Sequence, residues 1–160
     1  MIRFSRPLVV KIIFVSTMAA SLSACERYAV TLNQQPIYTP PPLYSKFTLA
    51  DEALMTCVKQ TIVDQNVTAA DKLTRLSCSH AGVRTLDGLE HFAALEELDV
   101  SFNKLQDISI MNGLKKLRVL KINDNPALSC DQLAALKHAE LTIIPPVHCV
   151  EQAEMESSER

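Results

Sequence analysis

The sequence lacks the glycine content of a flexible chain and the excess of basic residues of a nucleic-acid-binding chain. Its 160 residues include no Trp and only three Gly, while 48% are hydrophobic, so most of the chain is neither disordered nor a flexible linker. Basic residues do not dominate either, because 16 Lys and Arg stand against 18 Asp and Glu. Arg3, Arg6 and Lys11 fall within the first 24 positions, and without that segment the net charge is -5, from 13 basic and 18 acidic residues. This balance gives no electrostatic reason to expect a nucleic-acid partner.

Motifs of catalysis and of metal binding are also missing. The sequence contains no G-x-S-x-G, phosphate-binding loop or H-E-x-x-H, and its four histidines have no matching nucleophile motif. No C-x-x-C pair occurs, and His80 and His148 have no ligand-like spacing, which argues against a zinc site. We therefore expect no enzyme activity, no catalytic residue, no metal and no cofactor.

The first 24 residues have the pattern of an export signal. The start, MIRFSRPLVVK, is basic, and the apolar run of residues 12–24 ends in small side chains, as secretory signals do. A helix of 13 residues is too short to cross a hydrocarbon layer about 30 Å thick. The segment is therefore predicted to be a signal peptide and not a membrane anchor.

The four residues Leu22-Ser23-Ala24-Cys25 resemble the lipobox of bacterial lipoproteins. The resemblance implies cleavage before Cys25, a diacylglyceryl group on its thiol and an acylated amino group, which together give a lasting membrane anchor. The alternative is an ordinary signal peptide with a chance cysteine. In Gram-negative lipoproteins Asp in the next position favours the inner membrane, so Glu26 favours the outer membrane, with the protein facing the periplasm.

Residues 25–46 are predicted to be a tether. Four prolines, at 36, 40, 41 and 42, favour an extended, partly polyproline II segment. The run Pro40-Pro41-Pro42 is interpreted as a stiff spacer, and a docking motif for a proline-binding module is the alternative. At the other end, the acidic residues 150–160 are expected to form a disordered tail.

A spacing of 22 residues relates three segments of the chain. LTRLSC, LEELDV and LRVLKI begin at residues 73, 95 and 117, with apolar residues at their first, fourth and sixth positions. Further columns are apolar in all three copies: Val83, Leu105 and Ala127; Leu86, Ile108 and Cys130; Leu89, Met111 and Leu133; Phe92, Leu114 and Leu136. A spacing of three and then two fits neither a lone helix nor a lone strand.

The pattern resembles the leucine-rich repeat, L-x-x-L-x-L-x-x-N-x-L, and in length the repeats of internalin-like proteins. Over residues 47–149 it implies an α/β solenoid of three coils, in which each L-x-L forms a short parallel strand and the asparagine satisfies backbone groups where the chain turns. In that family a small helical cap covers the first coil, which matches residues 48–72 here. Two departures are Ala81, in place of the first asparagine, and Pro126, which distorts the third copy.

Four cysteines besides Cys25 predict two disulfides in an exported chain, with three possible connectivities. In the repeat register Cys78 takes an inward position beneath the cap helix that carries Cys57. Cys130 takes an inward position near the chain segment that ends at Cys149. We therefore pair Cys57 with Cys78 and Cys130 with Cys149, so that a disulfide closes each cap.

The outward residues of the predicted strands form the candidate binding face: Arg75, Ser77, Ser79, Glu97, Asp99, Ser101, Phe102, Val119, Lys121 and Asn123. Phe102 has two interpretations, as an exposed anchor for a partner or as a residue that packs on its neighbours at the strand end. Asp99 and Lys121 are expected to be cross-strand neighbours. Lys115, Lys116, Arg118 and Lys121 form a basic corner, either simply solvated or suited to anionic lipid or polysaccharide.

Together these features predict a lipid-anchored periplasmic protein that binds another envelope protein, in addition to the membrane contact through Cys25. The alternative is a structural envelope lipoprotein without a dedicated partner surface.

Overall fold

The structure is a computed structural model that describes residues 30–136 and 140–158. The chain divides into two compact units, Met1–Pro41 and Pro42–Arg160. No helix within the described ranges has the length and apolar content needed to cross a membrane. The predicted signal peptide and Cys25 lie outside the described residues.

The described part of the first unit is a β-hairpin. Strands β1 (Val30–Leu32) and β2 (Gln35–Tyr38) pair antiparallel. The two loop residues, Asn33 and Gln34, have φ values of 50° and 65°, and two-residue hairpin loops of type I′ require positive φ at both positions. The expectation of an extended spacer is therefore wrong for residues 30–38, because the short loop lets the two flanking segments pair.

The second unit begins at Pro42, earlier than the boundary at residue 47 that the sequence predicts. The reason is a small aromatic cluster. The Tyr44 ring stacks on Phe47 with centroids 5.8 Å apart, and both rings meet the buried Phe92 edge to face, at 6.2 and 5.2 Å. This contact attaches the end of the predicted tether to the domain core.

An N-terminal helix, α2 (Glu52–Asp64), forms the predicted cap of the first coil. Its buried residues, Leu54, Val58 and Ile62, follow helical spacing and join the core. A short 3₁₀ turn, η1 (Ala70–Lys72), leads from this cap into the first strand.

Asp51 caps α2 and also fastens it to the first coil. One carboxylate oxygen accepts the amide of Leu54 at 2.9 Å, as a helix N-cap does. The other accepts the amides of Arg84 and Thr85, at 2.8 and 3.4 Å. Burial by itself would raise the pKa of the Asp51 carboxyl, but these amide donors together lower that pKa below its ordinary value.

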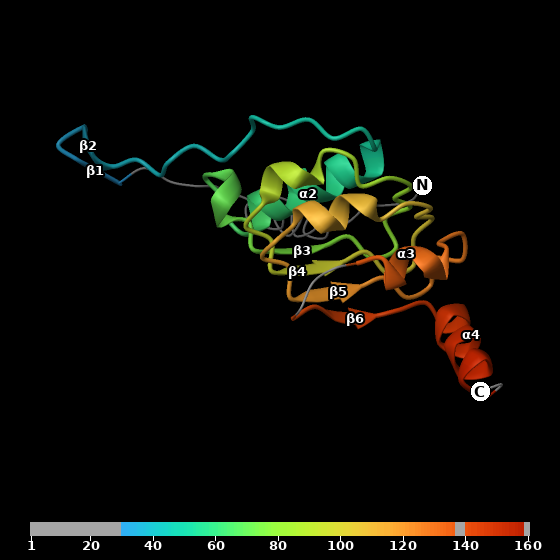
Figure 1. The fold of residues 1–160 in the computed structure, drawn as a ribbon. Helices are drawn as coiled ribbons and strands as arrows, with labels where there is room; N and C mark the ends of the chain where they lie inside the picture. Colours follow the sequence, from blue (N-terminus) through green and yellow to red (C-terminus); the bar gives the residue numbers. More distant parts are fainter. Residues whose placement is uncertain (1–29, 137–139, 159–160) are drawn as a thin grey trace, which may run out of the picture. The chain divides into compact units, whose positions relative to one another are not determined.

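Four short parallel strands lie side by side in one sheet (Figure 1): β3 (Arg75–Ser77), β4 (Glu97–Asp99), β5 (Val119–Lys121) and β6 (Thr142–Ile144). The first three are the strands predicted from the repeat, and β6 adds a fourth. The register advances by 22 residues from β3 to β4 and from β4 to β5, but by 23 from β5 to β6.

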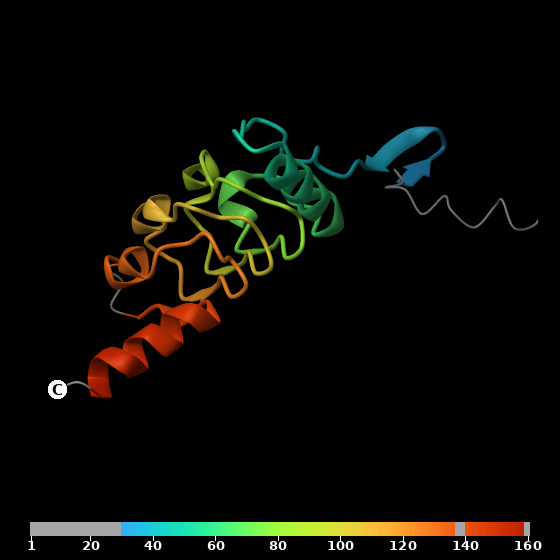
Figure 2. The ribbon, with the colours of Figure 1, turned by 90° about the vertical axis from the view of Figure 1, so that its right-hand side faces the viewer.

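The chain returns from each strand through a short helical segment. These are η2 (Leu89–Phe92), η3 (Ser109–Gly113) and α3 (Cys130–Ala134), which follow one another along one side of the stacked coils in Figure 2. Between the strands and these segments lies one continuous core made of the predicted apolar columns. Its fully buried members include Leu73, Leu89, Phe92, Leu95, Leu98, Leu105, Ile108, Met111, Leu114 and Leu120.

The extra residue of the third coil shifts its packing. Ala127, which the 22-residue alignment places in an inward column, is exposed, and its neighbour Leu128 is buried instead. Pro126 lies directly before this shift, where the sequence predicts a distorted copy.

Two buried asparagines join successive coils. Asn103 makes five hydrogen bonds with backbone groups: its Oδ1 accepts from the amides of Gly82 and Val83, and its Nδ2 donates to the carbonyl oxygens of Cys78, Val100 and Ser101. Asn125 bonds in the same manner with the second coil and with its own coil, through Leu105, Val100, Ile122 and Asn123. Each asparagine therefore reaches back to the coil before it.

Helix α4 (Val147–Ser158) follows the last strand, and among its first residues Cys149 is buried. The expectation that residues 150–160 are disordered is wrong for residues 150–158, which are helical. Pro146 lies directly before the helix, where a fixed φ and a missing amide favour a helix start. The disulfide at Cys149 then ties the first turn of α4 to Cys130 on α3.

Candidate functional site

The outward side chains of the first three strands form one uncovered surface, which we call the strand face: Arg75, Ser77, Glu97, Asp99, Val119 and Lys121. Alternation along each strand produces it, because the middle residues, Leu76, Leu98 and Leu120, point into the core. Arg75, Ser77, Glu97 and Lys121 are exposed, while Asp99 and Val119 are half-buried. The strand face therefore offers charged and polar groups at fixed spacing.

The strand face lines a hollow of about 570 Å³. Its rim includes Gln65, which follows the end of α2 and whose Nε2 donates to the backbone carbonyl of Arg75 at 3.2 Å. Sequence reasoning missed Gln65, because a residue after a cap helix carries no repeat signal that would place it beside β3.

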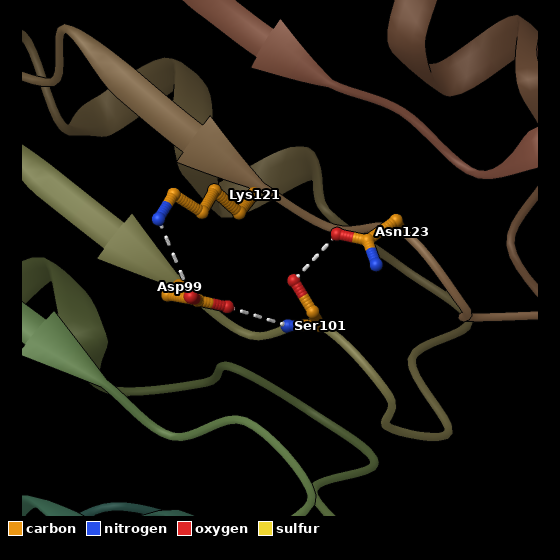
Figure 3. Close-up of polar contacts among 4 residues, drawn as sticks. All are labelled: Asp99, Ser101, Lys121 and Asn123. Carbon is orange, nitrogen blue, oxygen red and sulfur yellow. Dashed lines mark hydrogen bonds and ion pairs between the residues drawn. The ribbon is translucent and has the colours of Figure 1, made fainter.

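Hydrogen bonds and an ion pair hold one end of this face in place (Figure 3). Lys121 Nζ lies 3.7 Å from Asp99 Oδ2, and Asp99 Oδ1 accepts the Ser101 amide at 3.1 Å. The Ser101 hydroxyl donates to Asn123 Oδ1 at 2.7 Å. The expected pairing of Asp99 with Lys121 is confirmed, and it belongs to a connected network that spans the second and third coils.

Ser101 is not part of the accessible face, contrary to the prediction. Only 4% of its surface is exposed. Its small side chain lies between coils, where the hydroxyl bonds to Asn123. Of the other predicted positions beyond the strands, Ser79 is exposed and Asn123 is half-buried.

Phe102 packs on a neighbour at the strand end and is also partly exposed, so its role as an anchor for a partner stays a prediction. Its ring stacks on His80, with centroids 4.2 Å apart and planes at 14°, yet 46% of the residue remains exposed. One side of the ring is therefore packed and the remainder is available to a partner. His80 is not among the predicted residues of the face, although it lies in the same 22-residue column as Phe102.

The structure contains the two predicted disulfides, Cys57–Cys78 and Cys130–Cys149. The first joins the cap helix to the first coil, and the second joins α3 to α4. A ring nitrogen of His148 and the two sulfur atoms of the second disulfide lie within 4.8 Å of one another. Because those sulfur atoms are bonded to each other, they are not thiolate ligands.

Residues 93–138 match the family model described as Leucine Rich repeats (2 copies). This match covers the second and third coils, and the parallel strands with their cross-coil asparagines agree with it. The chain therefore contains leucine-rich repeats arranged as a solenoid.

Among solved structures, the chain is similar to two bacterial proteins. One is the structure of the CBM51-2 domain in complex with GlcNAc and the INT domains of Clostridium perfringens ZmpB, with 24% identity, a TM-score of 0.38, and coverage of 54% of this chain and 19% of that one. The other is internalin C2 of Listeria monocytogenes, with 21% identity, a TM-score of 0.40, and coverage of 58% and 53%. The matched region therefore spans about a fifth of the ZmpB chain and about half of the internalin C2 chain. No curated protein matches the sequence.

Proposed function

We propose that this chain is a bacterial lipoprotein whose leucine-rich repeats bind another protein of the cell envelope through the strand face. The export pattern and the lipobox-like residues Leu22 to Cys25 support anchoring through Cys25, and Glu26 supports the outer membrane, with the domain facing the periplasm. Leucine-rich repeats commonly serve as protein-interaction modules, which supports a protein partner.

The main support for the proposal is the strand face, because its side chains are accessible and some of them are held in place. Helical segments cover the other side of the coils, whereas no described element of the domain covers the outward side chains of β3 to β5. The network from Lys121 to Asn123 holds two of those side chains, Asp99 and Lys121, in place before any partner arrives. Groups that are already ordered lose less conformational entropy on binding, so preorganisation favours affinity.

A binding role also agrees better with this face than catalysis does. Among the described residues that line the hollow, the Ser77 hydroxyl has no hydrogen bond to a base that would activate it, and the aromatic residue at the edge of the face is suited to contact with a partner. The second candidate is a structural envelope lipoprotein without a dedicated partner surface, in which the domain only fills or spaces the envelope.

Site-specific photocrosslinking in living cells separates these two candidates. A photoreactive residue at Glu97, on the strand face, should capture one defined envelope protein, and the same residue at the exposed His91, on η2, should not. The substitution Arg75→Glu should abolish capture at Glu97 while leaving the amount of folded protein unchanged. Equal capture at both positions, or none at Glu97, would contradict a binding face and support the structural candidate.

The anchor has a separate test. Cells fed a palmitate analogue should incorporate it into the protein, and the substitution Cys25→Ala should remove the label. Absence of label in the wild-type protein would contradict the lipid anchor but leave the binding face untouched.

A further inference from the structure

Three residues that follow the strands share an uncommon backbone conformation. His80, Phe102 and Asp124 have φ values of 58°, 57° and 55°. They lie 22 residues apart, at the same position of successive coils, and we call these three residues the turn column. His and Asp are enriched among the few non-glycine residues with positive φ, whereas a bulky side chain there is an outlier. Such outliers cluster at functional sites, where surrounding structure keeps them in place. Phe102 is therefore the residue of the column that is least suited to a positive φ.

The column is held at a fixed spacing by the backbone. The amide of His80 donates to the carbonyl oxygen of Ser101 at 3.1 Å, and the amide of Phe102 donates to that of Asn123 at 3.0 Å. Phe102 thus lies one coil away from His80, on which its ring stacks, and one coil away from Asp124, whose side chain is much shorter. On the side of the third coil, no aromatic ring among residues 30–136 and 140–158 continues the stack.

Asp124 takes the next position of the turn column after Phe102, where an aromatic residue would supply a third ring. Its Oδ2 accepts a hydrogen bond from the neutral amide of Asn123 at 2.8 Å. Among the described residues, no Lys or Arg nitrogen lies within ion-pair distance of Asp124, although Asp99 has such a partner in Lys121. The end of the column therefore combines an aromatic ring, an exposed carboxylate and no balancing cation.

We propose that the turn column binds an arginine side chain of the partner protein, an inference that rests on the proposed function. A guanidinium is planar and cationic, stacks on aromatic faces and pairs with carboxylates through two parallel hydrogen bonds. It would continue the stack beyond Phe102 and meet the carboxylate of Asp124. A lysine supplies the charge without the plane, and a sugar ring supplies a stacking face without the charge.

A small probe tests this site without knowledge of the partner. The full mature chain, solubilised in detergent and labelled with ¹⁵N, is titrated with the blocked tripeptide acetyl-Gly-Arg-Gly-amide. We expect saturable changes in the amide signals of Phe102, Asn123 and Asp124. The lysine analogue should bind several-fold more weakly, and the citrulline analogue, which has the shape of arginine without its charge, should leave these signals unchanged.

Two substitutions and one control give the result its specificity. Asp124→Asn and Phe102→Leu should each weaken binding of the arginine probe by about tenfold, as expected for loss of a charge-assisted bond or of a stacked aromatic contact. Asp71→Asn, which removes an exposed carboxylate on η1, should leave the affinity unchanged. Urea unfolding of each variant verifies that the domain still folds.

Several outcomes would overturn the inference. Equal binding of the citrulline analogue, signal changes elsewhere than at the column, or no effect of Asp124→Asn would each do so. If methyl glucoside changes the same signals and the arginine probe does not, the column is a sugar subsite.

If crosslinking at Glu97 captures a partner but the probe does not bind, the arginine site fails alone. If the probe binds and crosslinking captures nothing, the proposed function fails instead.

Discussion

Replacing Asn103 with Ala should destabilise the repeat domain strongly, because this side chain joins two coils from within the core. Only 4% of Asn103 is exposed. Its Oδ1 accepts amide hydrogen bonds at 2.8 and 3.0 Å, and its Nδ2 donates to three backbone carbonyl oxygens at 2.9, 2.9 and 3.0 Å. Asn103→Ala therefore takes one hydrogen bond from each of five backbone groups. The carbonyl oxygens of Val100 and Ser101 keep a second bond, from Asn125 and His80, so the main loss falls on the amides of Gly82 and Val83 and the carbonyl of Cys78.

The size of the effect follows from the cost of burying unpaired polar groups. Each buried group that loses its hydrogen bond costs roughly 1–3 kcal/mol, and water and backbone relaxation recover part of the sum. We expect the free energy of unfolding to fall by about 4 kcal/mol, which is a large loss for a single substitution. With a urea dependence of about 2 kcal/mol per molar, the unfolding midpoint should fall by about 2 M.

Urea unfolding followed by far-ultraviolet circular dichroism measures this loss, because the chain has no Trp for fluorescence. Asn123→Ala is the matched control: its side chain is half-buried and bonds to other side chains at the face, so its loss should cost less than about 1 kcal/mol. Asn103→Asp keeps the acceptor oxygen but turns a second oxygen toward the three carbonyls, so it should be at least as damaging as Ala. If Asn103→Ala lowers stability no more than Asn123→Ala, the cross-coil role of Asn103 is refuted.

Three further predictions test the caps and the turns. Replacing Cys130 and Cys149 with Ser opens a loop with a sequence separation of 19 residues, so the free energy of unfolding should fall by about 3 kcal/mol; an unchanged urea midpoint would refute this. Because the pKa of Asp51 is lowered in the folded state, its carboxylate contributes stability above about pH 4 that is lost as pH falls through the folded-state value. Urea midpoints of the wild type and Asp51→Asn should therefore converge as pH falls below about 4, and a constant difference would contradict the assignment. Gly88→Ala should cost about 2 kcal/mol or more and Gly82→Ala about 1 kcal/mol, since both have positive φ but only Gly88 would place a Cβ 2.7 Å from a backbone oxygen; equal losses in thermal unfolding would count against the close contact.

The solenoid could be predicted from the sequence because the same pattern of apolar residues occurs in three successive copies. Each inward column occurs in several copies, so one ambiguous residue does not hide the period of 22. The structure also explains the departure at Ala81. Asn103 and Asn125 each bond to the turn of the preceding coil, and the coil that carries Ala81 is preceded by the cap helix, which offers no such turn. An asparagine there would lack the amides of a preceding coil, which the side-chain oxygens of Asn103 and Asn125 accept.

Segments outside the repeat could not be predicted as well, because each occurs once. The hairpin of residues 30–38 depends on two loop residues with positive φ, and nothing else in the chain repeats that signal. Pro145 and Pro146 are a signal for the start of helix α4, but the acidic composition after Cys149 favours disorder instead. Ser101 shows a different limit, since alternation does not predict whether a residue of the neighbouring coil covers a side chain, as Asn123 does here.

The two roles of Phe102 can be separated by a substitution that fits the backbone better than phenylalanine does. Phe102→Asn relieves the strain of a bulky residue at a φ of 57°, worth about 1 kcal/mol, and loses the stacking on His80, worth about 0.5–1.5 kcal/mol. These terms nearly cancel, so the urea midpoint should change little while partner capture at Glu97 and binding of the arginine probe both decrease. A loss of more than about 2 kcal/mol would instead identify packing as the main role of Phe102. Unchanged stability together with unchanged binding would refute its role as an anchor.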